Sequence, residues 1–83
     1  MLKLYSIKDT KGGFSAPFLA QNDALAARNV KTVINSQKGS PENLYPEDFE
    51  LWYIGEFDEI TGIIQPAALD CVCRLATLKD EVA

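Results

Sequence analysis

The residues that could do chemistry in this 83-residue chain are carboxylates, cysteines and cations, because the chain has no histidine. Without an imidazole it lacks the usual base that activates a serine or cysteine and the usual nitrogen ligand of zinc. Adjacent acids occur at Glu47-Asp48 and Asp58-Glu59, and paired carboxylates can bind Mg²⁺ or act as acid and base. Neither pair has the ligand spacing of a calcium loop, so we expect solvated turn residues, no metal and no cofactor.

The cysteines and glycines also lack the spacing of a catalytic motif. Cys71 and Cys73 form a C-x-C pair, whereas zinc and redox sites use C-x-x-C, and zinc needs a second pair of ligands. We therefore expect two buried thiols in a reducing compartment. Gly12-Gly13 lacks the full glycine pattern and the following Lys-Ser/Thr of a phosphate loop. The sequence thus predicts a protein that is not an enzyme.

The charges are distributed unevenly along the chain, whose net charge is -4. Residues 1–40 contain six cations and two acids, whereas residues 41–83 contain two cations and ten acids. Phosphate binding depends on a local cluster of cations rather than on the total charge. The alternative is that two solvated faces differ in charge by chance.

Aromatic residues lie close in sequence to the first cations. Proteins that bind single-stranded DNA combine stacking rings with a positive groove. Phe14 and Phe18 are expected in the core, which leaves Tyr5 as the ring available for stacking. The candidate nucleic-acid contacts are Lys3, Lys8, Lys11, Arg28 and Lys31.

No targeting or membrane segment is visible in the sequence. Residues 1–9 lack the apolar run of about 7 to 15 residues that a signal peptide needs. No stretch approaches the roughly 18 apolar residues of a bilayer-spanning helix. We expect a protein of the cytoplasm with no membrane partner.

The first half of the chain predicts a hairpin followed by a long helix. Residues 2–8 alternate as a strand does, Asp9–Gly13 is a turn, and Phe14–Ala20 returns as an edge strand because of Pro17. Asn22 is a helix cap, and the helix is expected to end near Lys38-Gly39. Its apolar stripe consists of Ala26, Val30, Val33 and Ile34.

The second half predicts a second hairpin and a short C-terminal element. Residues 40–48 read as a loop, Phe49–Phe57 as a strand, Asp58–Gly62 as a hairpin loop and 63–65 as a return strand ended by Pro66. Residues 67–77 have both helical and strand periodicity, and we favour a short helix after Pro66. Residues from about 78 to 83 are expected to fray.

These elements predict one α+β domain over residues 1–83: β-β-α-β-β, a mostly antiparallel four-stranded sheet with one long helix on one face and a short C-terminal element. Phe49, Leu51, Tyr53 and Phe57 are expected on one face of their strand, and Trp52 and Ile54 on the other.

The sheet face away from the helix is expected to remain partly uncovered. The residues that we expect to share it are Tyr5, Ile7, Trp52 and Ile54. An exposed aromatic patch usually marks an interface, and burying it between two copies would stabilise a small domain. We therefore expect a homodimer or a larger homo-oligomer.

Landmarks in a fixed order also point to a known family. They are Tyr5-Ser6-Ile7 with Asp9, Pro17-Phe18, Asn22-Asp23-Ala24 with Arg28, Pro46-Glu47-Asp48-Phe49, and YIGEFDEITG from Tyr53 to Gly62. From Leu2 to Gln65 the chain resembles the small nonstructural protein of gokushoviruses, a Microviridae group of single-stranded DNA phages. It departs from that pattern at Gly12-Gly13, at Tyr45 and after Pro66.

The resemblance implies a non-enzymatic protein made in the cytoplasm of the infected bacterium. It implies a role in DNA binding and in single-stranded genome synthesis or its coupling to packaging, and it supplies no catalytic residues. The alternative is a protein-interaction adaptor that engages a phage or host replication or capsid component without contacting DNA. The acidic second half would steer such an adaptor toward a basic partner.

Overall fold

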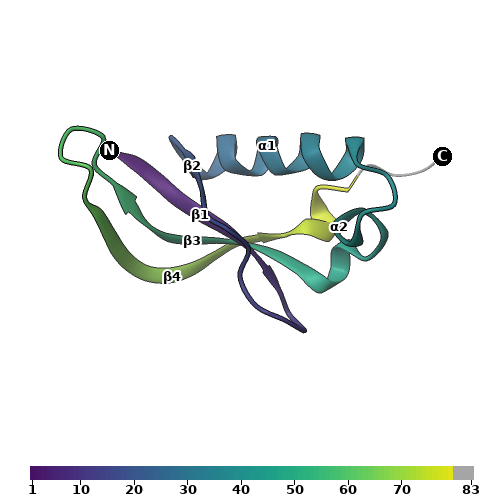
Figure 1. Ribbon diagram of the computed structural model, residues 1–83. Helices are drawn as coiled ribbons and strands as arrows, with labels where there is room; N and C mark the ends of the chain where they lie inside the picture. Colours follow the sequence, from purple (N-terminus) through teal and green to yellow (C-terminus); the bar gives the residue numbers. More distant parts are fainter. Residues whose placement is uncertain (80–83) are drawn as a thin grey trace.

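The protein is an α+β domain in which one long helix lies against a single four-stranded sheet, as the sequence predicts (Figure 1). The computed structural model describes residues 1–79. All strand pairs are antiparallel, in the order β2-β1-β3-β4. The elements are β1 (Leu2–Asp9), β2 (Phe18–Ala20), α1 (Asp23–Ser36), α2 (Pro41–Leu44), β3 (Phe49–Phe57) and β4 (Ile64–Arg74), with 3₁₀ turns η1 (Pro46–Asp48) and η2 (Leu75–Thr77).

The long helix α1 begins at the predicted cap. The Asn22 side-chain oxygen accepts a hydrogen bond from the backbone N–H of Leu25 at 2.9 Å, which satisfies one of the free donors at a helix start. Three of the four predicted stripe residues are buried, but Val33 is 48% exposed. The helix ends at Ser36, slightly before the predicted position, and Gly39 follows with a φ of 89°.

The connection between α1 and β3 contains short helical turns where a loop was predicted. The Ser40 hydroxyl accepts from the backbone N–H of Asn43 at 3.2 Å, and Pro41 occupies the first turn of α2. The fixed φ of proline suits a first helical turn, so this short segment curls into a helix.

The second strand is much shorter than predicted. Only Phe18–Ala20 pairs with β1, and Pro17 precedes the strand rather than lying within it. Residues 10–17 leave the sheet and return to β1 through a single bridge between Lys8 and Phe14. Ser15 fixes this return, because its backbone N–H donates to the Ile7 carbonyl at 2.8 Å.

The prediction of a short helix over residues 67–77 is wrong. Strand β4 passes through Pro66 and runs on to Arg74, and only Leu75–Thr77 forms a 3₁₀ turn. β4 is the edge strand of the sheet, and an edge strand tolerates proline because its outer side needs no donor. The sequence of this segment has both helical and strand periodicity, and pairing with β3 makes it a strand.

The expected fraying of the tail does not begin at residue 78. Leu78 packs against the core, and its carbonyl accepts from the Asn35 side-chain amide at 3.0 Å. Residues 80–83 lie outside the described part of the chain.

A bulge at Ile54 changes the faces of β3. Tyr5 pairs with Tyr53, whereas Leu4 pairs with Gly55, so Ile54 is the extra residue. Beyond the bulge, Glu56 lies on the side of Tyr53 and accepts from its hydroxyl at 2.9 Å. The predicted placement of Phe57 on the Tyr53 face is therefore wrong, because a bulge reverses the alternation.

The core lies between α1 and the sheet. It consists of Tyr5, Ala20, Ala26, Val30, Ile34, Phe49, Leu51 and Leu75. Tyr5 has no exposed surface, and its hydroxyl donates to the Asp23 carboxylate at 2.6 Å. Ile7 packs against the same core. The prediction that Tyr5 and Ile7 share a face with Trp52 is wrong, since their partners across the sheet are Tyr53 and Leu51.

Candidate nucleic-acid interface

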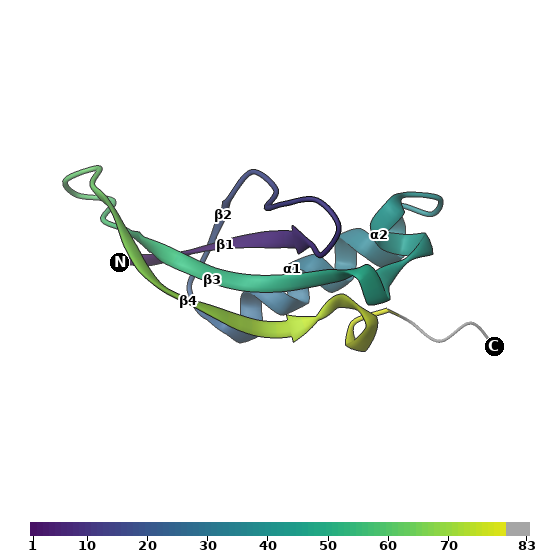
Figure 2. The same ribbon diagram turned by 90° about the horizontal axis from the view of Figure 1, so that it is seen from below.

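One face of the sheet has no helix over it in the described residues. Figure 2 views the molecule from this side and shows β3 and β4 in front of α1. Ser6 and Lys8 of β1 pair with Trp52 and Glu50 of β3, and alternation points these side chains away from the helix. The 10–17 loop folds over one end of this face and buries Ser6, whose hydroxyl donates to the Ser15 carbonyl at 2.8 Å.

Lys8 is held over two aromatic rings on this uncovered face. Its ammonium nitrogen lies 5.3 Å from the centre of the Trp52 ring and 5.7 Å from that of Phe14. The two rings meet edge to face with their centres 6.2 Å apart. Each ring face attracts the cation through its quadrupole. We call Lys8, Phe14 and Trp52 the Lys8 site.

The Glu50 carboxylate lies beside the Lys8 site and limits its positive charge. The Trp52 indole N–H donates to the Glu50 carboxylate at 3.1 Å, and Arg74 lies opposite Glu50 on β4. Lys11 approaches Asp48 at 3.5 Å, but its side chain is largely exposed. An exposed ion pair of this kind contributes little and can rearrange when a phosphate approaches.

The structure does not gather the five predicted DNA-contacting cations on one surface. Lys8 lies on the uncovered face and Lys11 lies in the turn after β1, beside Asp48, whereas Lys3 lies over the Tyr53 ring on the helix side of the sheet, 5.4 Å from its centre. Arg28 and Lys31 are exposed on α1. The two ion pairs among residues 1–79 involve the N-terminus and Lys11, so no acid in this part of the chain pairs with Arg28 or Lys31.

The predicted interface residues are divided in the same way. Tyr5 is fully buried by its own subunit and offers no contact area, and Ile7 faces α1. Trp52 and Ile54 remain partly exposed. For these two residues a contact with another molecule stays a prediction.

The cysteines are less buried than predicted. Cys71 is exposed and lies opposite Trp52 in the sheet register, because it belongs to the edge strand rather than to a packed helix. Desolvation, followed by the charges of Glu50 and Asp70, raises the pKa of the Cys71 thiol. Within residues 1–79 no three His, Cys, Asp or Glu side chains come together as a metal site would require.

The exposed ring of Phe14 is the feature of this site that sequence reasoning missed. Phe14 was expected in the core, yet it is 46% exposed and packs edge to face against Trp52. The preceding Gly12-Gly13 turn was the available signal, because a tight turn brings the next residue back over the strand it has just left. Phe18 does pack against the core as predicted.

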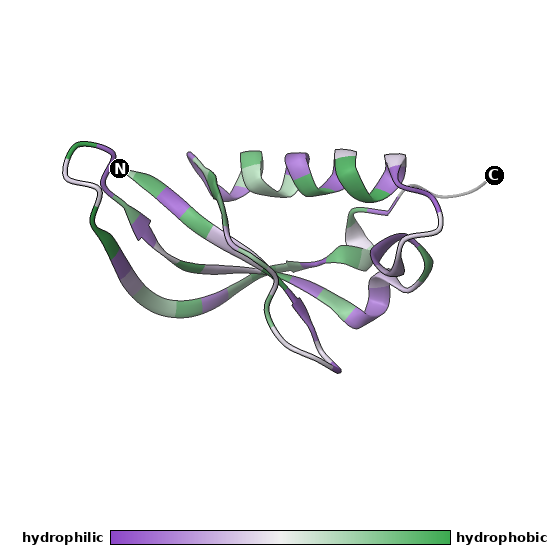
Figure 3. Ribbon diagram, in the orientation of Figure 1, coloured by the Kyte–Doolittle hydropathy of each residue, from purple (hydrophilic) through white to green (hydrophobic). Residues whose placement is uncertain are grey.

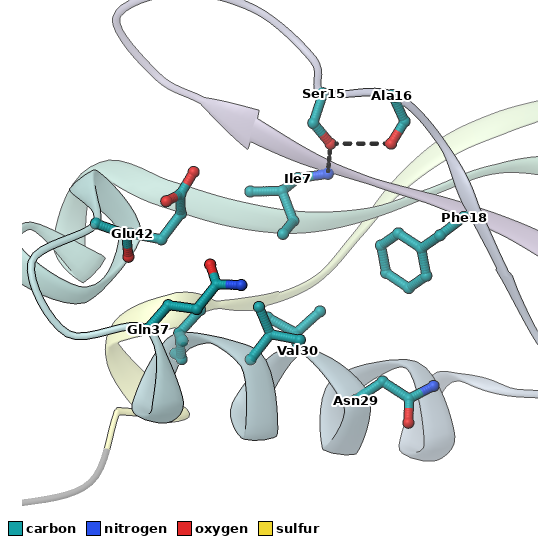
Figure 4. A pocket seen from close by; sticks show the side chains of 11 residues that line it. Ile7, Ser15, Ala16, Phe18, Asn29, Val30, Gln37 and Glu42 are labelled. Atoms are coloured by element: carbon teal, nitrogen blue, oxygen red, sulfur yellow. Dashed lines mark hydrogen bonds between the residues drawn. The ribbon is translucent and has the colours of Figure 1, made fainter.

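A second surface feature is an apolar groove between α1 and the 15–18 segment. It has a volume of about 430 Å³, and Figure 4 shows Val30 and Phe18 facing into it with Gln37 and Glu42 at one end. The groove exists because β2 begins only at Phe18, so the preceding residues do not extend the sheet beside α1. The C-terminal half of α1 is left without a strand beside it, and Val33 stays exposed.

These features define a class: a small two-layer α+β protein whose uncovered sheet face carries aromatic rings around a cation. The family model described as Phage ORF5 protein matches residues 2–78. The chain therefore belongs to the Phage ORF5 protein family and is a small bacteriophage protein. The sequence resemblance ended at Gln65, whereas the match to the family model continues through β4.

No curated protein and no solved structure matches the chain. Among residues 1–79 no helix has the length and apolar character that crossing a membrane takes.

Proposed function

We propose that this phage accessory protein binds single-stranded DNA weakly, as a homo-oligomer, during replication of a gokushovirus-like genome in the bacterial cytoplasm. The observation that carries the proposal is Lys8 held over Trp52 and Phe14 on the uncovered face. Membership of the Phage ORF5 protein family supports the viral context. The role requires no catalytic step.

The Lys8 site has the two components that sequence-independent binding of single strands uses. Stacking on an aromatic ring contributes about 1–3 kcal/mol per base and tolerates any base, since every base has a π-face. Phe14 offers an exposed ring and Lys8 offers a cation over it, and Lys11, three positions before Phe14 in the same loop, offers a second exposed cation. A strand lying along this face would place bases on the ring and phosphates near the lysines.

The surrounding acids determine how strong this binding can be. Asp48 and Glu50 lie beside the cations, and the chain as a whole carries a net charge of -4. Long-range repulsion of DNA opposes the local attraction, and salt screens both. We therefore expect measurable affinity at low ionic strength only.

A titration of a labelled single-stranded oligonucleotide at low salt tests the proposal. Reversing the charges with Lys8→Glu and Lys11→Glu should weaken binding at least ten-fold and lower the salt slope by about 0.7 per lost phosphate contact. Arg28→Glu with Lys31→Glu makes the same change in net charge on α1 and is the matched control. Equal loss in both double variants, or no binding by the wild type, would show that the uncovered face is not the site.

The second candidate function is a protein-interaction adaptor that contacts no DNA. The apolar groove with exposed Val33 favours it, because a concave apolar surface is a common docking site. A phage or host replication or capsid protein would be the partner. A nuclease-resistant partner recovered from infected cells by the wild type but not by Val33→Asp would support this function.

A further inference from the structure

A row of three charged residues crosses the uncovered face of the sheet. Lys8 of β1 pairs with Glu50 of β3, and Glu50 pairs with Arg74 of β4. Residues directly opposite one another point to the same side of a sheet, and the bond from the Trp52 indole N–H to Glu50 shows that this side is the uncovered one. Figure 2 shows the ends of β1 and β4 on either side of β3, and Figure 3 shows hydrophilic positions where β1 ends and β3 begins. We call Lys8, Glu50 and Arg74 the charged row.

Arg74 is an exposed cation that forms no ion pair within the described part of the chain. The two ion pairs among residues 1–79 belong to the N-terminus and Lys11. The Arg74 guanidinium donates to the Glu47 carbonyl at 3.5 Å, which is long for a hydrogen bond. A planar guanidinium presents several donors in the geometry that a phosphate accepts. Arg74 would therefore give up little to bind a phosphate.

The exposed Cys71 thiol reports that the three charges lie near one point of the uncovered face. Cys71 is opposite Trp52 in the sheet register. Desolvation and then the charge of Glu50 raise the pKa of Cys71, whereas the charges of Arg74 and Lys8 act to lower it. Both cations and the carboxylate are thus within electrostatic reach of the same thiol, as the register of the sheet requires.

The spacing of the two cations suits two phosphates of one strand. Neighbouring strands of a sheet lie about 4.8 Å apart, so the backbones of Lys8 and Arg74 are separated by about 10 Å across β3. The Phe14 ring lies at the Lys8 end, and stacking on it requires an unpaired base. A single strand that crosses β3 would therefore meet a ring and a cation at one end and a second cation at the other.

Other acids near the charged row face elsewhere or are paired. Asp48 is paired with Lys11, and Asp70 is opposite Tyr53 and hence on the helix side of the sheet. Glu47 is exposed, and salt screens the charge of an exposed carboxylate. The row itself has two cations and one carboxylate, so its balance is positive.

We infer that a single DNA strand crosses β1, β3 and β4 along the charged row, with one phosphate at Lys8 and a second at Arg74, and that Glu50 between them limits the affinity. The inference rests on the proposed DNA binding and adds a second phosphate position, on β4, to its site. The sequence analysis placed no contact in the acidic second half of the chain. A sum of charges conceals a single arginine that the sheet register brings beside Lys8.

Two substitutions with opposite effects test the inference in the low-salt titration with a single-stranded oligonucleotide. Arg74→Gln should weaken binding about five-fold, the contribution of an exposed ion pair, and lower the salt slope by about 0.7. Glu50→Gln keeps an oxygen for the Trp52 N–H but removes the charge, so it should tighten binding by a similar factor. Arg28→Gln, at an exposed cation on α1, is the matched control. Equal losses in Arg74→Gln and Arg28→Gln, or an affinity of Glu50→Gln no higher than that of the wild type, would overturn the inference.

Protection of Cys71 gives a second measurement at the same place. In a Cys73→Ser background Cys71 is the one cysteine of the chain, and thermal unfolding confirms that the variant is folded. Saturating oligothymidylate should slow the reaction of Cys71 with a thiol reagent, and an unchanged rate would overturn the inference. No binding by the wild type at low salt would refute the proposed function itself, whereas binding that depends on Lys8 but not on Arg74 would refute only the second phosphate position.

Discussion

At the scale of single residues, the two faces of the sheet differ because of what their polar groups contact. Tyr5 points into the core, and its hydroxyl has a partner there because Asp23 begins α1 directly above it. Lys8, on the opposite face, contacts rings rather than a carboxylate. The first residue stabilises the fold, and the second is available for binding.

Removing the Tyr5 hydroxyl tests the first of these roles. Tyr5→Phe should lower the free energy of unfolding by about 1–2 kcal/mol, because a hydrogen bond to a carboxylate is lost from a buried position. Tyr45→Phe, at an exposed tyrosine, is the matched control and should change little. Denaturant unfolding of the three proteins measures the difference. Equal stability of Tyr5→Phe and wild type would contradict the structural role of this bond.

The same tyrosine predicts a pH dependence. Burial, and then the hydrogen bond to Asp23, raise the pKa of Tyr5. The folded state therefore holds this proton more tightly than the unfolded state, so its contribution is complete below about pH 10 and declines above it. Unfolding measured above pH 10 should show a steeper loss of stability in the wild type than in Tyr5→Phe. If the free energy of unfolding fell with pH equally in the two proteins, the raised pKa of Tyr5 would be contradicted.

Phe14 allows the binding role to be separated from stability. Because this ring is half exposed, Phe14→Ala should lower the free energy of unfolding by less than about 1 kcal/mol. Loss of one stacking platform should nevertheless weaken single-stranded DNA binding about ten-fold. Thermal unfolding measures the change in stability, and an oligonucleotide titration measures the change in DNA affinity. An unchanged affinity would remove Phe14 from the site.

At the scale of elements, the β3–β4 hairpin depends on a close approach of two backbones. A side chain at Gly55 would place its Cβ 2.6 Å from the Gln65 carbonyl oxygen, closer than atoms in contact can lie. The approach occurs where the register of β3 and β4 shifts between Tyr53 and Gly55. The glycine is what lets this irregular hairpin stay paired.

Gly55→Ala should therefore lower the free energy of unfolding by about 1–3 kcal/mol, since neither backbone can move aside cheaply. Gly13→Ala is the control, because a Cβ there meets nothing within 4 Å. Denaturant unfolding compares the two variants. The close approach would be refuted if both variants were as stable as the wild type.

Elements differed in how well the sequence predicted them. The helix was predictable because its cap and its apolar spacing are local signals, and Asn22, Ala26 and Val30 behave as expected. β4 was not, because its strand conformation comes from pairing with β3 around a proline. Local periodicity cannot supply that information.

The candidate site was predictable only in part. Lys3 and Lys8 are separated by an odd number of positions, so alternation along β1 places them on opposite faces. Proximity in sequence had suggested one cluster. The Phe14–Trp52 contact joins residues far apart in the chain and depends on the path of the 10–17 loop, which no local pattern fixes.

At the scale of the whole molecule, function is proposed to arise from two separate surfaces. The Lys8 site lies on the uncovered sheet face, and the apolar groove lies beside α1 on the other side of the sheet. A protein partner in the groove would leave the Lys8 site open. Partner binding and DNA binding are therefore expected to respond to different substitutions.

The central claim, that single-stranded DNA binds at the Lys8 site, can be tested through Trp52 itself, the one tryptophan of the chain. Its fluorescence is measured while oligothymidylate is added at low salt. We predict that the emission changes on binding, that added salt reverses the change, and that Lys8→Glu with Lys11→Glu abolishes it. Binding that leaves Trp52 emission unaltered, or no binding at low salt, would contradict the account.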